Sequence, residues 1–166
     1  MTDKTLSTLF HDTLRDIYYA ERKILKSLPK MKRAAQSDEL KAAFEKHEAQ
    51  TEGQIERLER VFEIIDKTPR GKTCDAINGI LAEGDEIAEE YKDNPALDAG
   101  LLAAAQAVEH YEITRYGTLK RWATVLGLDE AVKLLDETLQ EESQTDEDLT
   151  KIADARINDA ALKDAA

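Results

Sequence analysis

The sequence predicts an all-α protein, a four-helix bundle made of two antiparallel hairpins. The first observation is the composition. Of the 166 residues, 42% are hydrophobic and only 5% are aromatic, and there are only 7 glycines and 3 prolines. Alanine and leucine therefore carry the hydrophobicity, and few residues interrupt helices. The second is that apolar residues recur every three or four positions, the period of an amphipathic helix. This length suits one core, so we expect a single domain over residues 1–166.

The first hairpin is predicted from two long amphipathic segments. Residues 6–35 follow the helical period, and Pro29 within them predicts a kink or a break because proline cannot donate the helical hydrogen bond. Ser37 predicts the N-cap of a second helix, since its hydroxyl can accept a bond from a free backbone N–H. This helix is expected to run to Asp66 and to end before the Pro69 and Gly71 turn.

The second hairpin follows a shorter amphipathic stretch at 74–91. Asn94 and Pro95 predict the start of a third long helix, because a capping residue followed by proline is typical of a helix N-terminus. Gly127 is a typical C-terminal stop. Asp129 then predicts the cap of a fourth long helix that runs through Ile152. The polar, alanine-rich tail that follows is expected to form a short C-terminal helix.

The lengths of the connections predict how the helices are joined. Those between the first and second and between the third and fourth long helices are a few residues each, so each pair should be antiparallel. The middle connection is long and partly helical. Two hairpins joined by a long crossover form the ferritin-like version of a four-helix bundle.

Charge and cysteine content exclude several partners. The net charge is −12 with a pI near 4.7, which would repel phosphate backbones and anionic lipid, so we expect no nucleic-acid or membrane partner. Cys74 is the only cysteine, which excludes an intrachain disulfide and suits a reducing compartment. The N-terminus lacks a basic start followed by an apolar run, and no stretch is long enough to span a bilayer. We therefore expect a cytoplasmic protein.

Four glutamates, one from each predicted long helix, fall on the apolar stripes: Glu21, Glu48, Glu112 and Glu142. Burying an ionised carboxylate is costly, so four must be neutralised by protons, basic partners or metal. The alternative is that they lie at the edge of the stripe and reach water, or pair with an arginine such as Arg57 or Arg115.

An internal repeat relates these glutamates in pairs. The segment that begins at Glu48 matches the segment that begins at Glu142 at an offset of 94 residues, and Glu21 matches Glu112 at an offset of 91. The second and fourth helices, and the first and third, therefore look like copies. Such symmetry is what a two-metal carboxylate site inside a bundle requires.

The chain resembles the YciE/YciF stress-protein family of the ferritin-like superfamily. The segments that carry the resemblance are Tyr19-Ala20-Glu21-Arg22, the run from His47 to Leu58, Glu109-His110-Tyr111-Glu112 with Arg115-Tyr116, and Glu141-Glu142-Ser143-Gln144-Thr145-Asp146. It covers nearly the whole chain. It implies a cytoplasmic bacterial protein, a homodimer of helical bundles and a di-iron site; family members are often named as ferroxidases.

One departure from the wider superfamily bears on the metal. In that superfamily the second and fourth helices usually supply the metal-binding motif Glu-x-x-His. In this chain, Thr51 and Thr145 occupy the positions of the two histidines. Oxygen-rich ligation suits iron, manganese, magnesium or calcium, and we expect two ions, iron first and manganese as the alternative. Glu109 and His47 lie near the same face and are candidates to complete the metal shell.

Two functions follow from these observations. The first is a di-iron carboxylate protein that couples Fe(II) oxidation to reduction of dioxygen or peroxide in a bacterial stress response. The alternative, suggested by the missing histidines, is a non-enzymatic stress or structural protein that kept the fold and lost the redox chemistry. In either case we expect a homodimer and no iron-storing cage, because the short acidic tail offers little for the additional interfaces of a cage.

Overall fold

The computed structural model describes residues 4–163, so the first three residues and the end of the C-terminal tail lie outside it. The described residues form helices and no strand. In chain order the elements are α1 (Leu6–Ala34), α2 (Asp38–Ile64), α3 (Asp75–Glu90), α4 (Leu97–Val125), α5 (Asp129–Ile152), η1 (Ala153–Ile157) and α6 (Asn158–Ala161). Among these helices, none combines the length and apolar character needed to cross a membrane.

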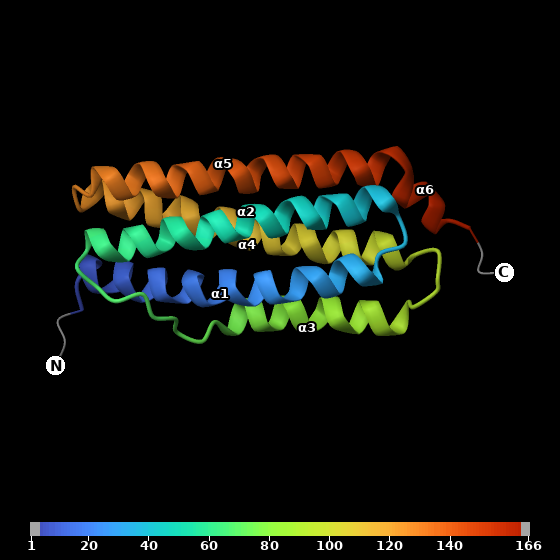
Figure 1. The fold of residues 1–166 in the computed structure, drawn as a ribbon, viewed down its shortest axis with the longest axis horizontal. Helices are drawn as coiled ribbons and strands as arrows, with labels where there is room; N and C mark the ends of the chain where they lie inside the picture. Colours follow the sequence, from blue (N-terminus) through green and yellow to red (C-terminus); the bar gives the residue numbers. More distant parts are fainter. Residues whose placement is uncertain (1–3, 164–166) are drawn as a thin grey trace.

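The four long helices lie side by side as two antiparallel hairpins, α1 with α2 and α4 with α5 (Figure 1). The bundle closes where α2 packs against α5 and α1 packs against α4. Helix α3 lies outside the bundle and packs against both α1 and α4, as the crossover between the hairpins. The predicted all-α, ferritin-like bundle with a partly helical crossover and a short C-terminal helix is confirmed.

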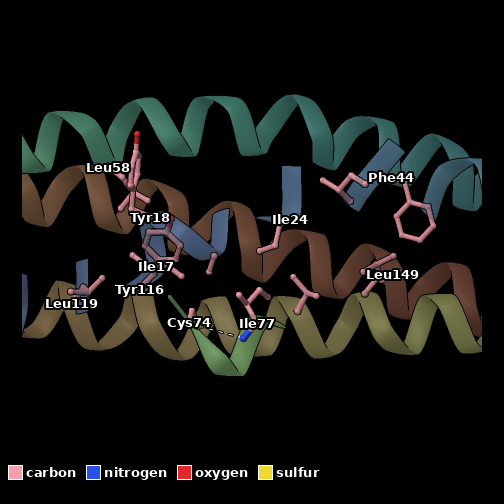
Figure 2. Close-up of a cluster of buried hydrophobic side chains, with 14 of the residues drawn as sticks. Ile17, Tyr18, Ile24, Phe44, Leu58, Cys74, Ile77, Tyr116, Leu119 and Leu149 are labelled. Atoms are coloured by element: carbon pink, nitrogen blue, oxygen red, sulfur yellow. Dashed lines mark hydrogen bonds between the residues drawn. The ribbon is translucent and has the colours of Figure 1, made fainter. Parts of the chain in front are cut away.

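Each long helix buries residues spaced alternately three and four apart, the seam of a left-handed bundle. In α5 this seam consists of Ala131, Leu135, Thr138, Glu142, Thr145 and Leu149. The seams are apolar toward both ends of the bundle: Figure 2 shows Leu58 with Leu119 at one end and Phe44 with Leu149 at the other. The buried polar residues therefore lie mainly in the middle of the bundle, and Asp98, which accepts from the backbone N–H groups of Gln36 and Ser37 at the turn between α1 and α2, is an exception at one end.

Several predicted helix ends are confirmed. The Ser37 hydroxyl accepts a bond from the Leu40 N–H at the start of α2. Gly127 has a positive φ of 71°, as expected for a residue that ends a helix in the left-handed conformation. The crossover helix begins after Cys74, whose sulfur accepts from the Ile77 N–H, a bond visible in Figure 2.

Two local predictions are wrong, and one of two alternatives at a third position is excluded. Helix α1 runs through Pro29, so the predicted break is excluded, because Met31 and Ala34 after the proline still pack against the core to which Leu28 before it belongs. Helix α4 begins at Leu97, after the predicted start at Pro95, because the Asn94 side chain bonds the Ala96 N–H within a turn and caps no helix. Helix α5 begins at Asp129 itself, and no side-chain bond caps it.

Candidate metal centre

Five ionisable side chains meet in the middle of the bundle: Glu21 from α1, His47 from α2, Glu109 and Glu112 from α4, and Glu142 from α5. The four glutamates are completely buried and the histidine is 3% exposed. All except Glu109 occupy seam positions of their helices, and Glu109 lies one turn before Glu112 on the same inner face. The periodicity that buries the apolar side chains therefore also brings these groups together.

Four of the five form a compact group. One ligand atom from each of His47, Glu109, Glu112 and Glu142 can be chosen so that all lie within 4.8 Å of one another. His47 Nδ1 lies 3.0 Å from Glu109 Oε1. On the other edge of the ring, His47 Nε2 lies 3.6 Å from Glu142 Oε2 and 3.9 Å from Glu112 Oε2. The imidazole thus stands between the carboxylates of α4 and α5.

Glu21 lies beside this group. Its Oε1 accepts a short hydrogen bond from the hydroxyl of Tyr116, which is itself completely buried. Tyr116 lies one turn beyond Glu112 on α4, so the two residues meet Glu21 from the same helix. The helical period puts Tyr116 on the same face of α4 as Glu112, but it gives no sign that the Tyr116 hydroxyl bonds a glutamate.

Glu48 is the predicted site residue that the structure does not bring to the cluster. It is half-buried, whereas His47 beside it points inward. The seam of α2 steps from Phe44 to His47 and then to Thr51, that is three residues and then four. The matching stretch of α5 steps from Thr138 to Glu142 and then to Thr145, four and then three. The repeat in sequence is present, but the inward position moves by one residue between the two copies.

Among the described residues, His47 is the one basic side chain that pairs with the glutamates of the cluster. Of the eight carboxylate oxygens of Glu21, Glu109, Glu112 and Glu142, seven have no hydrogen-bond partner, and neither does His47 Nε2. The two arginines considered from the sequence are engaged elsewhere: Arg57 pairs with Glu137 and Glu141, and Arg115 lies over the ring of Tyr111. Buried carboxylates of this kind fit a bound cation, because isolated burial of their charge is costly.

The threonines in the expected histidine positions do not extend the ligand set. Thr51 donates its hydroxyl hydrogen to the backbone carbonyl of His47, and Thr145 donates to that of Glu141. Each hydroxyl is satisfied within its own helix. The one histidine in the cluster is therefore His47, four residues before Thr51, and His110 lies exposed on the surface beside Asp146.

The electrostatics show how the metal-free cluster distributes protons. Burial, followed by repulsion from Glu142, raises the pKa of Glu112 well above its usual range, and burial also raises that of Glu109. Burial lowers the pKa of His47, but attraction to Glu109 and Glu142 outweighs it and the result is well above the usual value. Burial acts to raise the pKa of Glu142, yet the neighbouring Glu109 and His47 outweigh it and leave this pKa lowered. The shifts thus oppose one another within the cluster: the pKa values of Glu109, Glu112 and His47 are raised, and that of Glu142 is lowered.

This arrangement can exchange protons for metal ions. Carboxylates and one imidazole, all on rigid helices, could hold a metal ion in an oxygen-rich site. Metal and protons would compete for His47 and the glutamates, because metal ligands must be deprotonated. Affinity should therefore rise with pH.

Comparisons with known proteins agree with the fold. Residues 5–162 match the family described as Domain of unknown function (DUF892). The chain is 44% identical to Protein YciF of Escherichia coli K12 over 163 residues, which are 97% of this chain and 98% of that protein. The crystal structure of the E. coli stress protein YciF superimposes with a TM-score of 0.89 at 42% identity, covering 93% of this chain and 98% of that one.

Two further solved structures are similar. YcfI of Rhodopseudomonas palustris, whose description proposes a structural role, has a TM-score of 0.87 at 45% identity, covering 90% of this chain and 97% of that one. A protein of Xanthomonas campestris has a TM-score of 0.73 at 20% identity, covering 93% and 94%, which shows a shared fold alone. The family match over residues 5–162 and the 44% identity to YciF over nearly the whole of both chains show that this chain belongs to the DUF892 family. This is the YciE/YciF stress-protein family of the ferritin-like superfamily.

Proposed function

We propose that the buried cluster binds two iron ions and that the protein promotes oxidation of Fe(II) by dioxygen or peroxide. The observation that carries this proposal is the set of seven buried carboxylate oxygens without a hydrogen-bond partner around a single imidazole. A cluster kept only for stability would be expected to satisfy these atoms or to replace them with apolar groups.

The protein's own residues would have distinct tasks. His47, Glu109, Glu112 and Glu142 are close enough together to share one cation, and Glu21 at their side supplies carboxylate oxygens for a second. Tyr116 fixes the orientation of Glu21 through its hydroxyl. Two bound Fe(II) ions would each release one electron, so that one dioxygen and two protons give hydrogen peroxide, or one peroxide and two protons give two water molecules.

Iron uptake and oxidation test the proposal together. Metal-free protein is mixed with Fe(II) without oxygen and then exposed to air, and the near-ultraviolet absorption of the ferric product is followed. The wild type should oxidise iron faster than buffer, and Glu112→Gln and Glu142→Gln should lose this. Glu52→Gln is the matched control, because Glu52 is exposed on α2. A wild-type protein that binds no iron would refute the proposal. Elemental analysis of protein purified without added metal would identify the native ion.

A non-enzymatic structural role is the second candidate. It is favoured by the structural role proposed for the R. palustris relative and by proton sharing, which lets the cluster persist without metal. On this view, a chelator leaves the melting temperature of the wild type unchanged, and replacing the glutamates with glutamine raises it. A marked fall in melting temperature on chelation, absent from the variants, would instead support metal binding.

A further inference from the structure

The seam between α1 and α4 is covered by α3. This crossover helix packs against both helices, but Ile77 is its one fully buried residue. Small residues line the contact: a Cβ placed on Gly84 would lie 3.5 Å from the Cβ of Ala104 on α4. Because α1 and α4 also carry Glu21, Glu109 and Glu112, this covered seam is the side on which α3 shields the metal cluster from solvent.

An inner cavity lies next to the cluster on this side. It has a volume of about 10 Å³, room for about one water-sized molecule. His47 and Glu109 line its inner end. The rest of the wall is apolar apart from Ser27, and includes Ile24, Leu28 and Ala105. It is therefore an apolar space in direct contact with two candidate metal ligands.

An outer cavity of the same size, about 10 Å³, lies beneath α3. Gly84 and Asp85 of α3 line it together with Ala104 of α4. The Asp85 carboxylate pairs with Lys30 of α1 at 2.8 Å, and both side chains are about half exposed, so this cavity reaches the surface edge of the seam. Four residues line both cavities: Ser27, Met31, Leu81 and Val108. These four residues, named the septum below, belong to the walls of both cavities; both cavities adjoin α3, and the inner one also reaches His47 and Glu109 of the cluster.

We propose that dioxygen reaches the cluster through these two cavities, passing the septum beneath α3. The inference rests on the proposed iron oxidation and names its oxidant and its path. An apolar wall favours a small uncharged, apolar molecule and disfavours a hydrated cation, because burying an ion in such a space is costly. Met31 of the septum is unbranched and has several rotatable bonds, so it can change rotamer to let a diatomic molecule pass. The metal ions must take another path.

Paramagnetic relaxation by dissolved dioxygen tests the path without any iron. In metal-free wild-type protein, oxygen pressure should relax the methyl groups of Val108, Leu81 and Met31 more strongly than those of Leu119, Ile55 and Leu139. Leu119 is buried like Val108, Ile55 and Leu139 are half-buried like Leu81 and Met31, and none of these three controls lines either cavity. Equal relaxation at both sets would overturn the proposal, whatever the iron assay shows.

A blocking variant links the path to turnover. Ser27→Leu places a larger apolar side chain between the two cavities, and it should abolish the extra relaxation and slow Fe(II) oxidation by dioxygen. Anaerobic Fe(II) binding should be unchanged, and peroxide should still oxidise bound iron. The matched control is Lys26→Leu, since Lys26 is exposed and precedes the septum residue. Unchanged aerobic oxidation in a folded Ser27→Leu protein would refute the path. Extra relaxation in a wild type that oxidises no iron would refute the proposed function, while the cavities would still be shown to take up dioxygen.

Discussion

Replacing Glu21 with glutamine should stabilise the metal-free protein at high pH and leave it unchanged at low pH. Burial, with repulsion from Glu142, raises the pKa of Glu21 from 4.5 to about 8. Between these two values the folded state keeps a proton that the unfolded state has lost, so stability falls as pH rises. The loss is about 1.4 kcal/mol per pH unit, or about 5 kcal/mol once the pH exceeds 8. Glutamine cannot ionise, and its carbonyl oxygen can still accept the Tyr116 hydroxyl.

This magnitude is large against the stability of about 5–15 kcal/mol that is typical of a folded protein. For a chain of 166 residues, a gain of about 5 kcal/mol corresponds to a rise of roughly 10–20 °C in melting temperature. Thermal and urea unfolding of the wild type and Glu21→Gln in excess chelator should diverge from about pH 5 to pH 8. Parallel stability profiles over this range would show that Glu21 is not forced to ionise in the folded protein, and the reasoning would fail. With iron present, the wild type should become more stable than Glu21→Gln, because only the wild type can use the Glu21 carboxylate to bind iron.

Three further outcomes are expected. Tyr116→Phe removes the one donor to Glu21 and should cost about 1.5–3 kcal/mol in chelator above pH 8, where the carboxylate is charged, and less at pH 5, as measured by urea unfolding. Glu48→Gln should retain iron binding and oxidation, because its side chain is off the seam; loss of iron binding would return Glu48 to the ligand set. Light scattering at physiological salt should give a mass near twice 18.6 kDa, and a mass near 18.6 kDa would reject the proposed homodimer.

The fold could be predicted because it depends on a period repeated many times. An error at one position, such as the start of α4, leaves the apolar stripe of the helix intact. Pro29 illustrates the limit of local rules: the missing hydrogen bond costs stability, but Leu28 before it is buried and Met31 after it still packs, partly buried, against the core in the same helix. Packing along the whole α1 stripe outweighs a single unfavourable residue.

The site was harder to predict because it depends on which of two adjacent residues faces inward. Glu48 and His47 differ by about 100° around a helix, and the period of apolar residues is too coarse to choose between them. The sequence repeat favoured Glu48, but the seam of α2 is shifted by one residue relative to α5. For Glu21 and Glu112 the repeat identified the inward residue correctly in both helices, because the seams of α1 and α4 match at the same offset as the two glutamates. The other buried pairs at this offset are Phe10 with Leu101, Leu14 with Ala105, and Ile17 with Val108.

The π-helical turn η1 at Ala153–Ile157 has a consequence for insertions and deletions along the last hairpin. Its wider turn holds one residue more than an α-helical turn would, and both Ala153 and Ile157 stay buried. Deleting one residue within this turn would restore regular α-helix beyond α5 without rotating Glu142. The same deletion between Asp129 and Glu142 would turn the carboxylate by about 100° relative to the start of the helix and out of the cluster. Insertions and deletions can thus be tolerated after Ile152. Between the Gly127 turn and Glu142, by contrast, the number of residues must stay the same.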